Sequence, residues 1–295
     1  MMWCEIYVRI SSIALSRLRL NRERGSGASV MSRPINELIS LRGRRALITG
    51  AASGIGRAMA LRFAEAGASL YLVDINEAGL NETTNEVRSR FSVDVSAYRV
   101  DLSRKREIDA LWDSIKGKEP DILVNNAGIY EFMDFLEVDE ETLERTLAVN
   151  LKSVFYMCQH MIRGRGNRGG VIINIGSIES ILPFARNLVH YDMSKMGIIA
   201  LTRALAKEYG PMGFRINVII AGGINTPGVQ RLRQEAILKL RIDVIRTGIE
   251  YFMRIPLKRL GDPDEVARVA LFLASDMASY VHGAAIPVDG GFLSA

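Results

Sequence analysis

Cysteine and histidine are scarce in this sequence of 295 residues. The two cysteines, Cys4 and Cys158, provide no disulfide framework. The three histidines lack the spacing to either cysteine that a metal-binding motif needs. We therefore expect no disulfide scaffold and no bound metal, and we expect Cys158, which stands among apolar residues, to pack in the core.

A basic surface is also missing from most of the chain, although the formal net charge is +5. Residues 1–45 contain nine arginines and three glutamates, whereas the remainder contains 29 basic and 30 acidic residues. A nearly neutral body has no basic stripe with which to neutralise the phosphates of a nucleic acid. We therefore expect a small-molecule substrate and no nucleic-acid partner.

The N-terminal region lacks a hydrophobic run that could cross a membrane. Residues 6–20 are apolar but are interrupted by three arginines, and no basic segment precedes them as in a secretory signal. We interpret residues 1–40 as a disordered or processed extension, with Met31 as an alternative first residue. Its arginine and serine content leaves a mitochondrial transit peptide as the alternative. We expect a cytoplasmic protein that does not associate with membranes.

Apolar residues make up 48% of the chain, enough to form a large core. Short apolar runs alternate with helical patterns, and the runs expected to form strands are 45–49, 69–73, 96–100, 121–124, 171–175, 215–220 and 285–288. This alternation predicts a doubly wound parallel sheet with helices on both faces, which is a three-layer α/β/α Rossmann fold. We expect a single domain of this type over residues 41–295. Ligands of such a fold bind at the carboxyl ends of the strands.

A glycine-rich turn joins the first expected strand to a helix. The turn runs from Gly50 to Gly56 (GAASGIG), so its backbone can approach a pyrophosphate while the helix N-terminus attracts the anion. Asp74 ends the second strand, where a carboxylate accepts hydrogen bonds from the adenosine ribose hydroxyls. Its charge would repel a 2′-phosphate, and neither Ser53 nor Asn76 supplies a cation to offset that repulsion. We therefore expect NAD rather than NADP.

Later strands end in polar or turn residues at the same edge of the sheet. Asp101 follows the third strand, where it either contacts the cofactor or caps a helix that begins at Ser103. Asn150 stands in an apolar helical pattern, so it either kinks the helix or has a function. The cofactor contacts expected from the first half of the chain are Gly50, Ser53, Gly54, Ile55, Gly56, Asp74, Ile75, Asp101, Leu102, Asn126, Ala127 and Gly128.

Tyr191 and Lys195 stand four residues apart, which places them one turn from each other on a helix. A nearby ammonium lowers the pKa of a tyrosine from its ordinary value near 10. A lowered pKa suits general acid–base catalysis on an alcohol or carbonyl. Such a pair alone is usually two surface residues, but Ser177 at the end of the preceding strand supports a catalytic interpretation.

Residues from about Arg44 to Gly291 resemble the short-chain dehydrogenase/reductase family. The motifs that carry the resemblance are Thr49-Gly50-x-x-x-Gly54-Ile55-Gly56, Asn125-Asn126-Ala127-Gly128, Asn150, Ser177 and Tyr191-x-x-x-Lys195. The resemblance implies that Tyr191 is the catalytic acid and base, and that Lys195 lowers its pKa and holds the nicotinamide ribose. It also implies that Ser177 binds the substrate oxygen and that Asn150 holds a water of a proton relay.

The resemblance continues beyond the strand at 215–220. The family usually has Pro-Gly where this chain has Ala221-Gly222, and we expect Gly222, Ile224 and Thr226 to contact the nicotinamide end of the cofactor. Residues 228–255 correspond to the variable lid over the substrate. The resemblance also implies a homotetramer or homodimer formed by the helices that begin near Asn150 and Tyr191. Five apolar residues on these helices either contact another copy of the chain or pack in the core: Met157, Met161, Ile198, Leu201 and Leu205.

The substrate is less constrained by the sequence. Expected contacts are Ser177 and Tyr191, and the further candidates are Glu179, His190, Tyr130 and Glu131. The first hypothesis is a dehydrogenase that transfers a hydride between NAD(H) and a secondary alcohol or ketone, such as a sugar, polyol or small alcohol. A 3-oxoacyl-thioester (acyl-carrier-protein) reductase is the alternative. A non-catalytic nucleotide-binding scaffold is the remote alternative. The presence of all four catalytic residue types argues against it, because a scaffold needs none of them.

Overall fold

The computed structural model describes residues 33–238 and 242–295. Most of the extension expected over residues 1–40 lies outside the described residues. Within its described part, Ile35–Ile39 forms a short helix, α2. The elements discussed below belong to the unit that spans Ile39–Ala295.

Seven parallel strands form the sheet of this unit. They are β1 (Arg45–Thr49), β2 (Ser69–Asp74), β3 (Val95–Arg99), β4 (Ile122–Asn125), β5 (Gly170–Ser177), β6 (Phe214–Ala221) and β7 (Ala285–Val288). Their order is β3-β2-β1-β4-β5-β6-β7, and every neighbouring pair is parallel. The chain therefore winds outward from β1 and then returns to continue at β4. This reversal creates the crevice at which doubly wound folds bind nucleotides, and the predicted fold class is confirmed.

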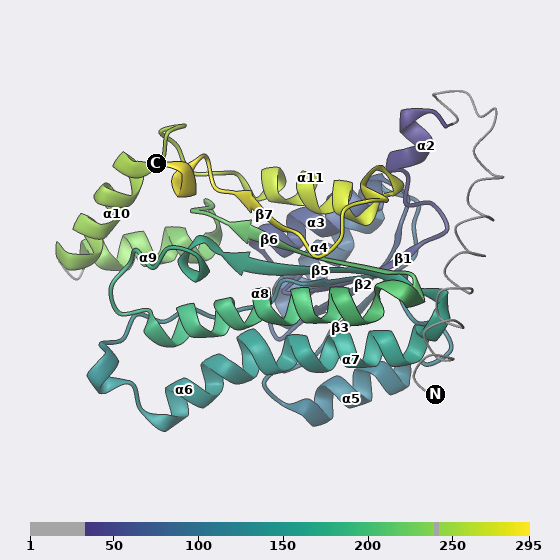
Figure 1. Cartoon of the computed structure of the whole chain (residues 1–295), viewed down its shortest axis with the longest axis horizontal. Coiled ribbons are helices and arrows are strands. Elements are labelled where there is room, and N and C mark those ends of the chain that lie inside the picture. The colour runs from purple at the N-terminus through teal and green to yellow at the C-terminus, as the bar shows by residue number, and fades with distance from the viewer. Residues whose placement is uncertain (1–32, 239–241) are drawn as a thin grey trace, which may run out of the picture. The chain divides into compact units, whose positions relative to one another are not determined.

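Helices cover both faces of the sheet (Figure 1). The helices are α3 (Gly54–Glu65), α4 (Glu77–Arg90), α5 (Lys105–Ser114), α6 (Glu140–Leu147), α7 (Ser153–Arg165), α8 (Val189–Tyr209), α9 (Pro227–Leu238), α10 (Ile242–Arg254) and α11 (Pro263–Ala274). Short 3-10 turns are η1 (Phe135–Glu137), η3 (Gly166–Arg168), η4 (Ile178–Ser180), η5 (Gly210–Met212), η6 (Asp276–Ala278) and η7 (Phe292–Ser294). One face is covered by α3, α4 and α11, and the other by α5, α7 and α8. No helix in the described residues is long and apolar enough to span a bilayer.

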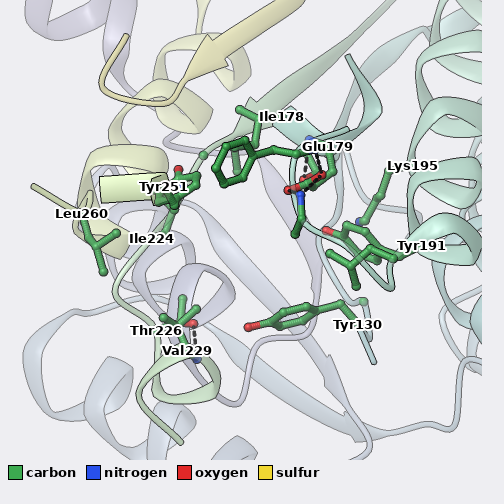
Figure 2. A pocket seen from close by; sticks show the side chains of 18 of the residues that line it. Tyr130, Ile178, Glu179, Tyr191, Lys195, Ile224, Thr226, Val229, Tyr251 and Leu260 are labelled. Carbon is green, nitrogen blue, oxygen red and sulfur yellow. Dashed lines mark hydrogen bonds between the residues drawn. The ribbon is translucent and has the colours of Figure 1, made fainter. Parts of the chain in front are cut away.

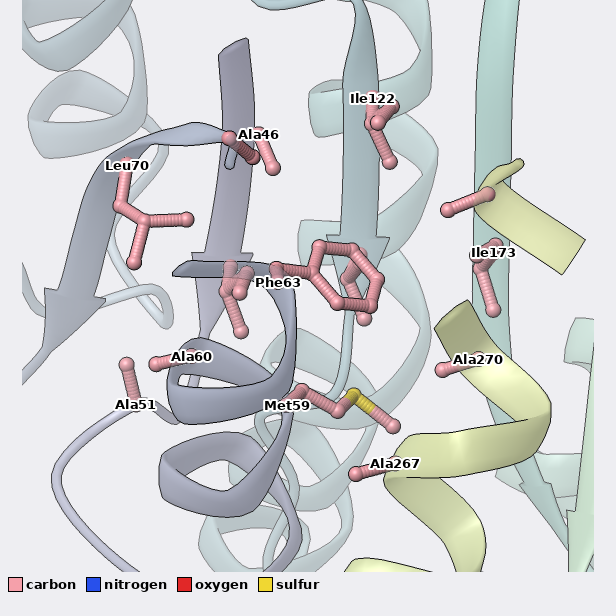
Figure 3. Packing of buried hydrophobic residues seen from close by; sticks show 14 of the residues in the cluster. Ala46, Ala51, Met59, Ala60, Phe63, Leu70, Ile122, Ile173, Ala267 and Ala270 are labelled. Carbon is pink, nitrogen blue, oxygen red and sulfur yellow. The ribbon is translucent and has the colours of Figure 1, made fainter. Parts of the chain in front are cut away.

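The core beneath α3 and α11 fixes the position of the glycine-rich turn. Met59 and Phe63 project from α3 between the sheet and α11, and both side chains are fully buried (Figure 3). The facing residues of α11 include Ala267 and Ala270, whose small side chains let the two helices approach closely. Because α3 is clamped in this way, its N-terminus is held firmly at the end of β1.

Two helical segments are divided in the structure. The apolar helical pattern around Asn150 is interrupted, because α6 ends at Leu147 and continues through a π-helical turn, η2 (Ala148–Lys152), into α7. The lid expected over 228–255 forms two helices, α9 and α10, and residues 239–241 between them lie outside the described residues. The buried Cys158 packs in the core as expected, and burial raises the pKa of its thiol to about 12.

Candidate active site

The glycine-rich turn is locked against the loop that follows β4. Gly50 has a φ of 68°, which favours glycine, and a Cβ placed on Gly56 would lie 2.0 Å from the Gly50 carbonyl oxygen. The Asn126 Nδ2 donates to the carbonyl oxygens of Thr49 (3.0 Å) and Gly50 (3.3 Å). The Thr49 Oγ1 in turn accepts from the backbone N–H groups of Asn126 (2.9 Å) and Ala127 (3.1 Å). Asn126 therefore shapes the predicted phosphate-binding turn and also lines the cavity beside it.

The first turn of α3 is open to an anion. Ser53 is the N-cap of α3 and makes no side-chain capping hydrogen bond, so the cap does not occupy the N–H groups of Gly54, Ile55 and Gly56. A Cβ placed on Gly54 would lie 3.2 Å from Thr226 Cγ2. The segment after β6 thus contacts the turn after β1. A dinucleotide site needs such neighbouring loops, because the two nucleotide halves of the cofactor bind to different strand ends.

Asp74 lies beside the same turn. Its Oδ2 accepts from the Ala52 N–H (3.0 Å) and its Oδ1 from the Asn76 N–H (2.9 Å). The side chain of the following residue, Ile75, is 56% exposed. Arg99 stands opposite Asp74 in the register of β2 and β3. The neighbouring strand therefore carries a positively charged side chain at the same level as the Asp74 carboxylate.

Asp101 organises its own loop. Its Oδ1 accepts from the Ser103 N–H (3.0 Å) and hydroxyl (2.6 Å), and Arg104 pairs with its Oδ2 (3.1 Å). Burial raises the pKa of Asp101, but the Ser103 hydrogen bonds and Arg104 outweigh it and hold the pKa below its ordinary value. The expected cap of a helix at Ser103 is wrong, because α5 begins at Lys105 and its N-cap is Arg104. The neighbouring Leu102 is buried in the core.

Ser177, Tyr191 and Lys195 line one cavity of about 690 Å³. The Ser177 Oγ accepts from the Glu179 N–H (3.2 Å), and Lys195 Nζ donates to the Ile175 carbonyl oxygen (3.0 Å). The Lys195 Nζ lies 5.8 Å from the centre of the Tyr191 ring. Figure 2 shows Tyr191 and Lys195 on one side of the cavity, with Tyr251, Leu260 and Ile224 on the other. The structure therefore brings the predicted catalytic side chains of β5 and α8 together.

The protonation of Tyr191 differs from the sequence expectation. Burial raises the pKa of Tyr191 well above its ordinary value, and only the hydrogen bond with Ser177 opposes the rise. Burial also lowers the pKa of Lys195 to about 8, so its ammonium is itself disfavoured. The expected lowering of the Tyr191 pKa by Lys195 is not found, because desolvation dominates at both groups. Tyr191 is therefore a protonated phenol at neutral pH.

Asn150 is fully buried in the π-helical turn. Its Oδ1 accepts from the Ile129 N–H and its Nδ2 donates to the Ile129 carbonyl oxygen, both at 2.8 Å. Its Nδ2 also donates to the Ser194 hydroxyl at 3.2 Å. A Cβ placed on Gly128 would lie 3.4 Å from both Asn150 Oδ1 and Lys195 Nζ. Asn150 therefore occupies a helix irregularity, as one of its two interpretations expects, whereas its functional role stays a prediction.

The candidate substrate contacts separate in the structure. Glu179 and Tyr130 line the cavity, and the Tyr130 ring centre is 5.9 Å from that of Tyr191. His190 is 3% exposed and does not line the cavity, so the structure does not place it at the substrate site. One residue along a helix rotates the side chain by about 100°, which points His190 away from the Tyr191 face. Glu131 is also outside the cavity lining and pairs with Arg145.

The turn after β6 is held from two sides. The Gly222 N–H donates to the Val288 carbonyl oxygen (3.0 Å), and the Gly223 N–H donates to the Tyr251 hydroxyl of α10. A Cβ placed on Gly222 would lie 2.6 Å from Asp289 Cα, so glycine is required by this close approach. These contacts hold the Ala221-Gly222 turn even though the family's proline is absent.

The helix α10 connects this turn to the C-terminal segment. The Tyr251 ring stacks on Phe292, with centroids 4.7 Å apart. The Arg254 guanidinium lies 5.0 Å from the Phe292 ring centre and donates to the carbonyl oxygens of Phe292 (3.3 Å) and Ala295. These contacts could not be predicted from the sequence, because they join residues some 40 positions apart through aromatic packing that has no local pattern.

Metal chemistry finds no support in the arrangement of side chains. Across residues 33–238 and 242–295, no three histidine, cysteine, aspartate or glutamate side chains form a group that could hold a metal ion. The cavity instead joins a nucleotide-binding turn to a hydroxyl pair and a buried lysine. Residues 50–293 of the chain match a family model described as enoyl-(acyl carrier protein) reductase.

The chain belongs to the short-chain dehydrogenase/reductase family. It is 37% identical over 261 residues to the 3-oxoacyl-[acyl-carrier-protein] reductase FabG of Thermotoga maritima, covering 86% of this chain and 99% of that protein. It is 35% identical over 258 residues to galactitol 2-dehydrogenase (L-tagatose-forming) of Cereibacter sphaeroides, covering 85% of this chain and 96% of that protein. Members of this dehydrogenase/reductase family are oxidoreductases of CH–OH groups, and so is this chain.

A solved structure supports the same assignment. A putative NAD(P)-dependent gluconate 5-dehydrogenase from Beutenbergia cavernae, with NADP bound at low occupancy, superposes with a TM-score of 0.80. It is 33% identical and covers 88% of this chain and 100% of its own. The dehydrogenase/reductase fold of this chain is therefore one that binds a nicotinamide dinucleotide, and the glycine turn and Asp74 described above fit that group.

Proposed function

We propose that this dehydrogenase/reductase interconverts a secondary alcohol and a ketone, with NAD(H) as its cofactor. The observation that carries the proposal is that Ser177, Tyr191 and Lys195 line one cavity, with the Lys195 Nζ 5.8 Å from the centre of the Tyr191 ring. A sugar, polyol or small alcohol is one substrate class, and the galactitol dehydrogenase relative supports it. A 3-oxoacyl thioester is the other, and the FabG relative supports that one.

The two hydroxyls act on the substrate oxygen. A bound nicotinamide supplies the hydride for ketone reduction and accepts it in alcohol oxidation. In reduction, negative charge develops on the substrate oxygen, and the Ser177 hydroxyl stabilises it by donating a hydrogen bond. The protonated Tyr191 phenol then transfers its proton to that oxygen. The raised pKa of Tyr191 favours this acid form at neutral pH.

Lys195 and Asn150 position the reacting groups. We assign Lys195 to the nicotinamide ribose, because its Nζ stands between the Ile175 carbonyl and the Gly128 turn at the cavity edge. Asn150 holds the backbone of Ile129 through both of its amide atoms. It thereby fixes the loop that carries Gly128 against Lys195, and a water between these groups would complete a proton relay.

The cofactor preference rests on Asp74. Its carboxylate is fixed next to the glycine-rich turn by the Ala52 and Asn76 amides. In that position it would accept hydrogen bonds from the ribose hydroxyls of NAD and repel the 2′-phosphate of NADP. The further cofactor contacts assigned here are those of the turns after β1, β4 and β6, including Gly222, Ile224 and Thr226, together with Ile75, Asp101 and Leu102 at the strand ends.

We also propose a cytoplasmic homotetramer or homodimer. Met157, Met161 and Ile198 are buried within the chain, so they cannot form a subunit contact. The apolar side chains that α7 and α8 leave exposed are instead Phe155, Val189, Met193 and Met196. These four residues are the proposed contact surface between copies.

The direct test follows the absorbance of NADH and NADPH over a panel of ketones, ketoses and 3-oxoacyl thioesters. We expect turnover with at least one ketone, and Tyr191→Phe should lower it by about 10²–10⁴-fold, the usual contribution of a general acid. The affinity of Tyr191→Phe for NADH should stay within about threefold, because the phenol hydroxyl is not part of the nucleotide turn. Undiminished turnover in Tyr191→Phe would remove this residue from the proposed role. NADH binding without turnover of any substrate would favour the scaffold hypothesis.

A further inference from the structure

The cavity beside Ser177 and Tyr191 extends away from the nicotinamide side between two apolar walls. From these walls we infer that the preferred substrate is a secondary alcohol or ketone that carries an extended apolar chain, which lies against α10. This inference rests on the proposed hydride-transfer function and narrows its substrate class.

Glu179 is the cavity residue that would best serve a polyol, but its carboxylate is already engaged. The Glu179 Oε2 accepts from the Phe184 N–H (2.8 Å), and both oxygens contact the Ala185 N–H at 3.3 Å. These bonds fold the loop after η4 so that the Phe184 ring meets Tyr251 (6.0 Å between centroids) and Phe292 (5.3 Å). Glu179 is therefore a positioning residue that builds an apolar wall.

The helix α10 presents a second apolar surface to the cavity. Ile249, Phe252 and Met253 have the i, i+3, i+4 spacing of one helix face, and all three line the cavity. They are 60%, 43% and 65% exposed, whereas Ile255 of the same segment is buried in the core. Exposed apolar side chains that border a reaction cavity mark a surface that an apolar ligand covers. Because this face is continuous with the hydroxyl pair, the substrate itself is the ligand that would cover it.

The opposite wall is aromatic. Tyr130 and Phe132 line the cavity with their rings in an edge-to-face arrangement at 5.8 Å. The Thr226 hydroxyl, which also borders the cavity, accepts the Val229 N–H at 3.3 Å. A polyol bound between these walls would leave several hydroxyls without partners, which costs free energy, whereas an alkyl chain loses no hydrogen bonds there.

The first test is a series of unbranched methyl ketones from butanone to decan-2-one, with L-tagatose as the polyhydroxylated comparison. We expect kcat/KM to rise about three- to fourfold for each methylene that enters the cavity, chiefly through a lower KM, until the chain leaves the protein. L-Tagatose should be a poorer substrate than octan-2-one by at least tenfold. Equal kcat/KM along the series, or a preference for the ketose, would overturn the inference while leaving hydride transfer intact. The absence of turnover with every ketone and thioester would instead refute the proposed function.

The second test removes part of the α10 surface. Phe252→Ser should lower kcat/KM for octan-2-one by about tenfold or more and for butanone by less than twofold, because only the longer chain reaches α10. Leu257→Ser is the matched control, since Leu257 is 64% exposed in the same segment but does not line the cavity. It should leave both values unchanged. Equal losses for the two ketones in Phe252→Ser would show that the helix acts only through the fold and would contradict the inference.

Discussion

At the scale of single residues, desolvation governs the reacting groups. Tyr191 and Lys195 are one helical turn apart; Lys195 is buried and Tyr191 is half-buried, and this desolvation raises the pKa of the phenol and lowers the pKa of the ammonium. The spacing in the sequence predicts that two side chains share one helix face. It does not predict how far the rest of the fold shields those side chains from solvent. For this reason the shared location of these side chains was predictable and the direction of their pKa shifts was not.

The charge on Lys195 gives the folded state a pH dependence. Its pKa is lowered to about 8 by burial, whereas the unfolded chain has the ordinary value of 10.5. Between these values the unfolded state binds more protons, so stability rises as the pH rises through this window. We expect the free energy of unfolding of the wild type, relative to Lys195→Met, to increase by about 2 kcal/mol between pH 7 and 9.5. Urea unfolding of both proteins at the two pH values measures this difference, and a constant difference would contradict it.

Asp74 should determine the choice between NAD and NADP. In Asp74→Ser the like charge facing a 2′-phosphate is removed, and Arg99 remains opposite on β3. We expect the ratio of kcat/KM for NADP to that for NAD to rise by about tenfold or more. Initial rates with both cofactors on one substrate measure the ratio. Glu77→Gln, a charge removal at the start of α4 just beyond this strand end, is the control and should leave the ratio unchanged.

At the scale of elements, the central strands were predictable because they are buried on both faces. Such strands are continuous apolar runs, and the runs at 45–49 and 171–175 lie within β1 and β5. Helix α4 was not predicted, because Leu80 and Val87 are its only large apolar residues in a segment rich in polar side chains. A helix kink at Asn150 was one of two interpretations of the sequence, but its π-helical form was not predicted, since it depends on contacts with Ile129 across 21 residues.

The turn between β1 and α3 is the element with the least steric freedom. A Cβ on Gly56 would lie 2.0 Å from the Gly50 oxygen and 2.7 Å from Asn126 Nδ2. We expect Gly56→Ala to cost about 1–3 kcal/mol of stability through overpacking and to weaken NADH binding as α3 shifts. Urea unfolding and fluorescence titration with NADH measure the two effects.

Gly117 is a control that separates the effect of a steric contact of the new Cβ from the effect of backbone strain. Gly117 has a φ of 80° but has no atom within 4 Å of a built Cβ. Gly117→Ala should therefore cost some stability and leave NADH affinity unchanged. If Gly56→Ala also kept full NADH affinity, the close contact would have no role in shaping the nucleotide site.

At the scale of the whole molecule, two helices leave an apolar surface uncovered. Phe155 is 47% exposed on α7, and Met193 and Met196 are each 50% exposed on α8. We expect the double variant Phe155→Glu/Met196→Glu to sediment as a smaller species than the wild type, because charges at a subunit contact must be desolvated. Leu136→Glu, at a side chain that is 89% exposed on η1, should sediment as the wild type does. A wild type that already sediments as a monomer would refute the proposed assembly.

The link between α10 and the C-terminal segment has a practical consequence for producing the protein. Arg254 holds the carbonyl oxygens of Phe292 and Ala295, and Phe292 stacks on Tyr251, whose hydroxyl binds the turn after β6. A purification tag or fluorescent fusion attached after Ala295 would begin within this set of contacts and could disturb α10. A tag at the other end of the chain adds no residue after Ala295, so kinetic comparisons of variants should use that arrangement.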